Sequence, residues 1–199
     1  PLYLSHKVTD VRGKPRIEEV DIAELDDKFE IIPGTTKTFK VDTLLLAVGL
    51  IPYVALSDNL GIPTSKSRGP VVNNNYQTQL PWFFVAGNAL HIHDLADDAY
   101  FEGEEAGRAA SLFINGKLKA PTNTLQVVPG YGINYVIPNN LELPLNTEEL
   151  VLKFRPKENY ENKRIVVKID DTVIFKKFFP FLFPSELVIL KVKKEKLTT

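Results

Sequence analysis

Two histidines, His91 and His93, lie two residues apart, and Asp94 follows them directly. If this stretch is a strand, both imidazoles point to the same side, where they could bind a zinc ion. A zinc site needs three or four ligands, and the chain has no cysteine and one further histidine, His6. We therefore expect no metal site here. The two imidazoles are instead expected to line a ligand site or to form local hydrogen bonds.

A glycine and an amide side chain, Gly87 and Asn88, follow the apolar run Trp82 to Ala86. Such a run is typical of a short strand that is covered on both faces, so we expect a buried strand there. The glycine lets the backbone turn tightly, and Asn88 places a polar group on that turn. Ligands bind at the carboxyl ends of strands in open α/β sheets, so this turn is a candidate binding site.

A helix is expected directly after the turn. Asp94 is a suitable N-cap, and the helix should stop at Asn115-Gly116. The carboxylates of Asp97 and Asp98 would stabilise its first turn. The remaining acidic residues of the helix are expected to form a solvated face, namely Glu102, Glu104 and Glu105. Two glycines four residues apart would let a neighbouring element pack closely, Gly103 and Gly107.

The order of Thr78, the apolar run, Gly87 and Asn88 resembles the second flavin-binding motif of FAD- and NAD(P)-dependent oxidoreductases of the pyridine nucleotide-disulfide reductase type. The stretch Val41 to Pro52 resembles the junction in that family at which the last NAD(P)-domain strand leads back to the FAD domain. The motif usually ends in aspartate, whereas Asn88 is uncharged. The segment Gly87 to Asp94 resembles more specifically a branch grouped with opine or hydrogen cyanide synthase subunits.

This resemblance implies FAD and NAD(P) as cofactors. Gly87 would permit close approach of the flavin, and Asn88 would hydrogen-bond the ribityl hydroxyls. The amide groups at the start of the following helix would face the flavin edge that becomes negative on reduction. By alignment this cofactor-binding locus falls at Asp98, Ala99 and Tyr100. No catalytic residue is indicated.

The family binds the FAD pyrophosphate and NAD(P) at two Gly-x-Gly-x-x-Gly turns, and neither motif is present in this sequence. The chain also has no methionine, even at position 1. We therefore expect that both cofactors need sequence upstream of Pro1. That sequence would be the upstream part of the same polypeptide or a complementing subunit. Self-association into a homo-oligomer is a further way to cover the strand Trp82 to Ala86.

The composition is that of a soluble globular protein, with 44% hydrophobic residues and a formal net charge of −1. This balance gives no reason to expect nucleic acid or a membrane as a partner. The absence of cysteine excludes a structural disulfide or a redox dithiol within this chain and, with no signal-peptide pattern, favours a cytoplasmic location.

The fold class expected is α/β, as the C-terminal part of a two-dinucleotide-binding-domain FAD/NAD(P) oxidoreductase fold, followed by a small antiparallel β-sandwich. Residues 1–50 would be the end of the NAD(P)-binding domain, and residues 51–119 the second segment of the FAD-binding domain. Residues 120–146, rich in Asn and Pro, would be a linker. Residues 147–199 would be an all-β C-terminal domain.

Alternation of apolar residues predicts a hairpin within residues 2–25 and a second strand pair, 29–32 with 38–41. Buried or short strands are expected at 43–48 and 70–72. Four strands are expected in the C-terminal part, at 149–155, 164–169, 172–178 and 186–194, with a tight Asp170-Asp171 turn between the middle two. Their core would include Phe154, Ile165, Val167, Phe175, Leu187 and Ile189.

These features predict the C-terminal portion of an FAD-dependent oxidoreductase that transfers hydride between NAD(P)H and a flavin. This chain alone would be colourless and inactive, because the residues present contribute only the ribityl contact and the edge of the ring. The alternative is a non-enzymatic interaction module or subunit whose β-sandwich binds a partner protein. Sequence upstream of Pro1 with two glycine-rich turns would distinguish the enzyme from that alternative.

Overall fold

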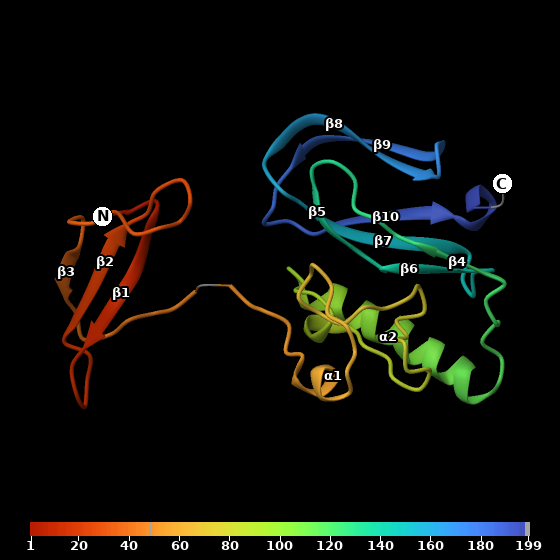
Figure 1. Cartoon of the computed structure of the whole chain (residues 1–199), viewed down its shortest axis with the longest axis horizontal. Coiled ribbons are helices and arrows are strands. Elements are labelled where there is room, and N and C mark those ends of the chain that lie inside the picture. The colour runs from red at the N-terminus through yellow and green to blue at the C-terminus, as the bar shows by residue number, and fades with distance from the viewer. Residues whose placement is uncertain (48, 198–199) are drawn as a thin grey trace. The chain divides into compact units, whose positions relative to one another are not determined.

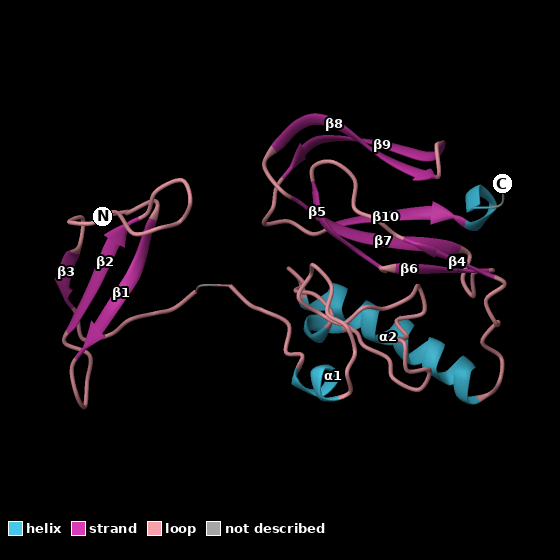
Figure 2. Cartoon of the chain, viewed as in Figure 1, coloured by secondary structure: helices cyan, strands magenta, loops and turns pink. Residues whose placement is uncertain are grey.

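A computed structural model describes residues 1–47 and 49–197, and the chain divides into two compact units, residues 1–49 and 50–199. Figure 1 shows the path of the chain, and Figure 2 shows its helices and strands. All described strands pair in antiparallel sheets of two or three strands. The described residues therefore form no parallel, doubly wound sheet. In this part of the chain, no helix has the length and apolar character that crossing a membrane requires.

The first unit is one antiparallel sheet in the order β1-β2-β3, formed by β1 (His6–Arg12), β2 (Glu19–Glu24) and β3 (Lys37–Lys40). The predicted N-terminal hairpin is confirmed, since β1 pairs with β2. The second predicted pair is wrong, because β3 pairs with β2 instead of with residues 29–32. Within that range, Ile31 forms only an isolated bridge with Leu25.

The apolar run after β3 is not the buried strand that we expected. Residues 43–47 form no strand, and Val48 lies outside the described residues. Leu45 and Leu46 are 89% and 66% exposed. An apolar run is buried as a strand only where neighbouring strands pair with it, and no described strand pairs with this one.

The second unit begins with α1 (Ala55–Asn59), followed by loops, the 3-10 helix η1 (Gly87–Ala89) and the long helix α2 (Ala96–Ile114). The short strand expected at 70–72 is reduced to one bridge, between Thr64 and Pro70.

The run Trp82 to Ala86 is also not a covered strand. Trp82 lies in a turn and is 60% exposed, whereas Val85 is buried. Phe84 forms a single bridge with Gln77. The prediction is wrong for the same physical reason as for residues 43–47, since no described parallel strand lies beside this run.

Helix α2 ends where the sequence predicts, with Asn115 at its C-cap and Gly116 at a φ of +65°. The first turn carries the predicted carboxylates Asp97 and Asp98. Its N-cap, however, is Leu95 and not Asp94. The expected close packing at Gly103 and Gly107 is not found among the described residues, because a Cβ built on either glycine would meet no atom within 4 Å.

Strands make up most of the remaining chain. They are β4 (Asn123–Gln126), β5 (Ile133–Ile137), β6 (Asn140–Leu143), β7 (Glu149–Pro156), β8 (Tyr160–Ile169), β9 (Thr172–Leu182) and β10 (Val188–Lys193), with the 3-10 helix η2 (Lys194–Leu197) after them. The four strands predicted near the C-terminus are confirmed as β7 to β10, and Asp170-Asp171 joins β8 to β9 as expected. β9 runs through Pro180, which a two-stranded sheet tolerates because each strand has a free edge.

The stretch 120–146, expected to be a linker, instead carries β4, β5 and β6. β5 extends the sheet to the order β10-β7-β5, and β4 pairs with β6. Apolar side chains of this stretch, including Val136, Leu141 and Leu145, are buried in the main core, which is why the segment is ordered despite its Asn and Pro content.

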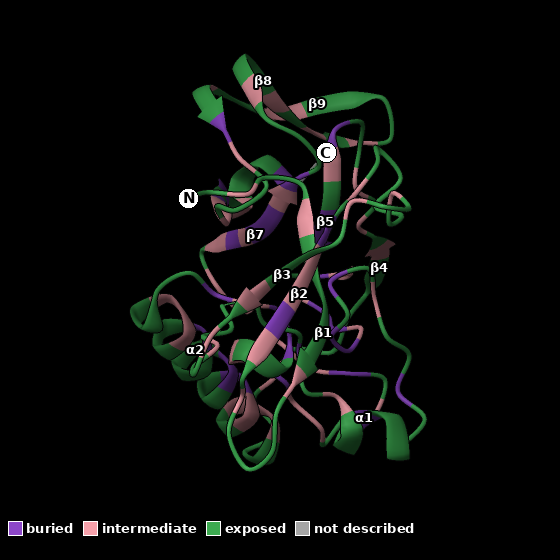
Figure 3. Ribbon diagram, turned by 90° about the vertical axis from the view of Figure 1, so that its left-hand side faces the viewer, coloured by how far each residue is buried: buried purple, intermediate pink, exposed green. Residues whose placement is uncertain are grey.

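The main hydrophobic core lies among the C-terminal strands, and β7 is largely buried there (Figure 3). Of the predicted core residues, Phe154 is buried, and three are half-buried against the core, namely Ile165, Val167 and Phe175. The other two, Leu187 and Ile189, are not part of it, because β10 turns Leu190 and Val192 inward instead. A second, smaller core joins Val72, Val85 and Leu90 to β5.

Candidate functional site

The turn that carries Gly87 and Asn88 is η1, which packs against α2. Gly87 has a φ of +66°, a conformation that glycine adopts without strain. A Cβ built on Gly87 would meet no atom within 4 Å, so the space beside it is open. Asn88 is exposed. These two predicted residues therefore lie on a surface that a ligand can reach.

The side chain of Asn88 is only half satisfied within the protein. Its Oδ1 accepts a hydrogen bond from the backbone N–H of His93 at 3.0 Å and lies 3.3 Å from His93 Nδ1. Both contacts use the carbonyl oxygen. In the described part of the chain, the Nδ2 group of Asn88 has no hydrogen-bond partner. The amide can therefore donate two hydrogen bonds to a bound molecule.

The start of α2 forms the second part of the predicted site. Asp98 and Ala99 are half-buried, and Tyr100 is 68% exposed. Leu95 at the N-cap contributes no side-chain hydrogen bond, so its side chain leaves the first amide groups of the helix uncapped. The positive end of the helix dipole favours a negative ligand group, whereas the Asp98 carboxylate opposes one. The five predicted cofactor residues thus lie on two adjacent segments, η1 and the start of α2.

Asp94 does not cap α2 because strand β7 and the residue before β10 engage both of its carboxylate oxygens. Its Oδ1 pairs with Nη2 of Arg155 on β7, and its Oδ2 accepts the N–H of Leu187 at 2.6 Å. Arg155 also donates to the carbonyl oxygen of Ile92 at 3.1 Å. The segment between η1 and α2 is therefore fastened to β7.

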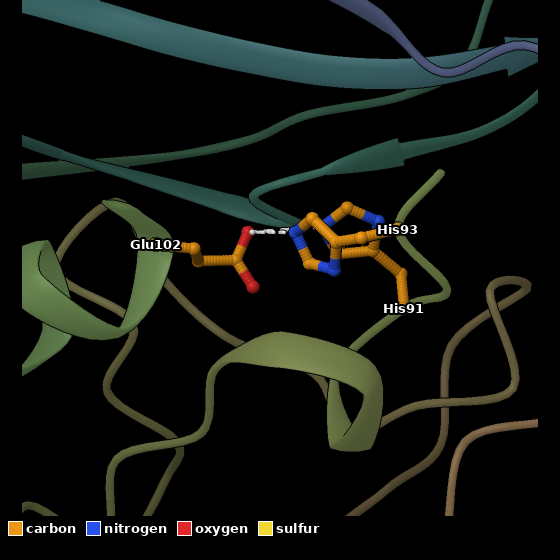
Figure 4. A group of neighbouring side chains, drawn as sticks. All are labelled: His91, His93 and Glu102. Atoms are coloured by element: carbon orange, nitrogen blue, oxygen red, sulfur yellow. Dashed lines mark hydrogen bonds and ion pairs between the residues drawn. The ribbon is translucent and has the colours of Figure 1, made fainter. Parts of the chain in front are cut away.

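A buried polar cluster joins η1, α2 and β7, and Figure 4 shows three of its side chains. Glu102 on α2 is fully buried, and its Oε1 accepts the N–H of Gly87 at 2.7 Å. Its Oε2 accepts from Nε2 of His91 at 2.9 Å and pairs with the ammonium group of Lys153 on β7. His93 Nε2 lies 3.4 Å from the same oxygen. The histidines thus form local hydrogen bonds, the second of the two roles expected for them.

Charges balance within this cluster. Burial alone would raise the pKa of Glu102, but the hydrogen bond from His91 and the charge of Lys153 hold that pKa well below its ordinary value. Burial lowers the pKa of His91 by more than Glu102 raises it. At neutral pH Glu102 is therefore ionised and His91 is neutral, with its Nε2–H donating to the carboxylate. The buried carboxylate is compensated by the buried ammonium group.

A metal site also has to be considered, because ligand atoms of His91, His93 and Glu102 lie within 4.8 Å of one another. Two buried imidazole nitrogens, Nδ1 of His91 and Nε2 of His93, have no hydrogen-bond partner among the described residues. Lys153, however, already lies on the Glu102 oxygen that faces both rings, and its ammonium group would repel a cation. The absence of a metal site therefore stays our prediction.

Sequence reasoning missed the two charged members of this cluster. Glu102 was expected on a solvated face, and this is wrong, although Glu104 and Glu105 are exposed. A signal was present, because Glu102 shares one helix face with two buried alanines at helical spacing, Ala106 and Ala109. For Lys153, the alternation of side chains along β7 indicated which face of the strand the residue lies on. It gave no indication that Glu102 would be its ion-pair partner.

Comparison with known proteins identifies the relatives of this chain. Residues 2–103, just over half of the chain, match the family model of pyridine nucleotide-disulphide oxidoreductases. The chain belongs to this family. A stretch of 69 residues is 38% identical to the mitochondrial dihydrolipoyl dehydrogenase of Schizosaccharomyces pombe, covering 34% of this chain and 14% of that protein. The chain thus spans a small part of the length of this relative.

Pyridine nucleotide-disulphide oxidoreductases are FAD- and NAD(P)-dependent. The residues on the candidate surface fit contact with FAD. Gly87 leaves open space, the Nδ2 group of Asn88 has no hydrogen-bond partner among the described residues, and the side chain of Leu95 does not cap α2. The more specific resemblance to the opine or hydrogen cyanide synthase branch stays a prediction.

Proposed function

We propose that this chain is the C-terminal portion of an FAD-dependent oxidoreductase that transfers hydride between NAD(P)H and a flavin. Membership in the pyridine nucleotide-disulphide oxidoreductase family supports the reaction class. The location is supported by the Nδ2 group of Asn88, which has no hydrogen-bond partner in the described part of the chain and lies beside the open space at Gly87. We name the flavin-facing surface as Gly87, Asn88, Asp98, Ala99 and Tyr100.

Each part of this surface has a physical role toward the cofactor. Gly87 has no side chain and would let the flavin approach the backbone. Asn88 would donate from Nδ2 to a ribityl hydroxyl, while its Oδ1 stays bound to the backbone of His93. The amide groups at the start of α2 would stabilise the negative charge that collects on the ring after FAD accepts the hydride. The Asp98 carboxylate opposes that charge, so we expect it to point away from the ring.

Glu102 acts through its neighbours and is a positioning residue. It holds the Gly87 N–H at 2.7 Å and the ring of His91 at 2.9 Å, so it fixes the turn on which Asn88 sits. Because Glu102 lies on α2 and is paired with Lys153 on β7, the position of the turn is fixed relative to both elements. A rigid turn keeps the amide donor of Asn88 in place before the cofactor binds.

The 199 residues contain no Gly-x-Gly-x-x-Gly turn, the element that binds the cofactor phosphates in this family. We therefore propose that the contacts to the cofactor phosphates come from residues outside these 199, either in an upstream part of the same polypeptide or in a complementing subunit. The flavin-facing surface alone offers a few hydrogen bonds and a helix end, which is too little to retain FAD.

The test compares two preparations. Residues 1–199 purified alone should be colourless after gel filtration and should not oxidise NAD(P)H. The same chain produced together with the polypeptide encoded directly upstream should carry flavin absorbance and oxidise NAD(P)H. Stoichiometric flavin on residues 1–199 alone would overturn the division of the site. Absence of flavin from both preparations would overturn the proposed function and favour a non-enzymatic module.

A further inference from the structure

The C-terminal strands form a partly open cavity of about 620 Å³. It lies within the main core, between the β8–β9 hairpin and the sheet β10-β7-β5, and Figure 1 shows the hairpin arching over that sheet. Its inner wall consists mainly of aliphatic side chains from seven strands and includes Leu125, Ile133, Leu152, Ile165, Ile174 and Leu190. The chamber is thus part of the apolar interior and is separate from the flavin-facing surface.

A cavity of this size does not persist empty in a small domain. Protein interiors are packed as densely as organic crystals, and the cost of a void grows with its volume. Water is a poor filling, because a buried water needs two to four polar partners. Apart from three histidine nitrogens elsewhere, no buried side-chain polar atom in the described part of the chain lacks a hydrogen-bond partner. No buried polar side-chain atom described on the inner wall therefore needs a water molecule as its hydrogen-bond partner.

The cavity lining also includes exposed residues. Gln126, Lys168 and Asp170 are polar and exposed, and Tyr131 is 99% exposed. On β8 the apolar residues Ile165, Val167 and Ile169 face inward but are only half-buried. An apolar cavity with exposed polar residues in its lining matches a molecule that has a long apolar body and one polar end. The volume lies within the usual range for small-molecule sites, roughly 300–1,000 Å³.

We propose that this cavity binds a long-chain amphiphile of the fatty-acid or fatty-alcohol class. The hydrocarbon chain fills the space under the β8–β9 hairpin, and the small polar head lies at the open, solvent-facing side of the cavity. Filling the cavity replaces missing contacts along Ile165, Ile174 and Leu190 with contacts to the chain. This site does not depend on the proposed oxidoreductase function.

Titration of the full chain with a dansyl-labelled fatty acid tests the proposal. We expect saturable binding of one probe per chain with a blue-shifted emission. Unlabelled alcohols from hexanol to tetradecanol should displace the probe, with affinity rising about fourfold per added methylene until the cavity is full. Dodecanoate and dodecanol identify the head: tighter binding of the acid indicates a carboxylate head, and equal binding indicates a neutral head. Absence of saturable binding, or no dependence on chain length, would overturn the proposal.

A matched pair of variants on β9 locates the site. Ile174→Trp fills the cavity with a side chain and should abolish probe binding while the far-ultraviolet circular dichroism stays unchanged. Val173→Trp adds the same ring at the adjacent position, which is 40% exposed and does not line the cavity, and should leave binding intact. If Ile174→Trp does not fold, Ile174→Phe replaces it. Equal probe binding by a folded Ile174 variant and by wild type would place the probe elsewhere and refute the site.

Discussion

Lys153 and Glu102, 51 residues apart in the chain, form an ion pair inside the protein that joins strand β7 to helix α2. Both side chains are withdrawn from solvent, with 7% and 0% exposure. The same carboxylate holds the N–H of Gly87, so this pair connects the C-terminal strands to the proposed cofactor surface.

Breaking this pair on one side should strongly destabilise the second unit. Lys153→Met leaves the Glu102 carboxylate buried without a counter-charge, and we expect a loss of about 3–5 kcal/mol in the free energy of unfolding. Urea unfolding followed by circular dichroism measures it. The double variant Lys153→Met, Glu102→Gln should recover part of the loss.

A control lies one turn further along the same helix. Glu105→Gln removes an ion pair with Arg108 in which both side chains are more than 40% exposed, and it should cost about 0–1 kcal/mol. Equal losses from the buried and the exposed variants would show that the buried pair contributes nothing special.

The stability of the second unit should fall as the pH falls below about 6.5. The pKa of His91 is lower in the folded protein than its ordinary value of 6.5, so below that pH the unfolded chain binds a proton that folded His91 does not. The pKa of Glu102 is also lowered, from 4.5, and it adds a further loss below that pH. The measurement is the free energy of unfolding between pH 7.5 and roughly pH 4.

His91→Gln should flatten the first part of this pH dependence while leaving the loss below 4.5 in place. An unchanged slope between pH 6.5 and 5 in that variant would mean that another group produces it.

Asn88→Leu in the flavin-loaded protein should weaken FAD retention by about 1–3 kcal/mol, because one or two buried hydrogen bonds are lost. Asn88→Asp should be milder, since it keeps an acceptor for the backbone of His93. Flavin released during dilution or ultrafiltration gives the comparison. Asn123→Leu, an exposed change on β4, is the control and should retain FAD like wild type.

Two glycine substitutions should have opposite signs. A Cβ on Gly69 would lie 1.8 Å from the carbonyl oxygen of Leu90, so Gly69→Ala must shift backbone and should destabilise by about 1–3 kcal/mol or more. Gly103→Ala meets open space inside α2 and should stabilise by about 1 kcal/mol. Melting temperatures of both variants against wild type give the result, and a stabilising Gly69→Ala would contradict the packing described here.

The C-terminal strands could be predicted because their signals are local. Apolar alternation and the Asp170-Asp171 turn are properties of short segments, and β7 to β10 follow from them. The strands expected at 43–48 and 82–86 depended instead on neighbouring strands that would pair with them. An apolar run is buried only through partners that the run itself does not specify, and the described neighbours do not supply them.

The candidate site divides in the same way. The turn at Gly87 and Asn88 could be predicted because the motif that marks it is contiguous in sequence, and the turn is accessible. The contacts that hold this turn come from three separate elements, and pairing of Glu102 with Lys153 has no local signal. Helical spacing alone would have placed Glu102 on the buried face of α2.

Strand β7 separates two environments with incompatible demands. Leu150, Leu152 and Phe154 line the apolar cavity, while Lys153 and Arg155 face the acidic groups of the opposite side. A slip of one residue would turn the ammonium and guanidinium groups toward the apolar cavity and set apolar side chains against Glu102 and Asp94. Burying the charged groups and leaving the carboxylates without partners are both costly. A register shift of β7 is therefore disfavoured on both faces of the strand.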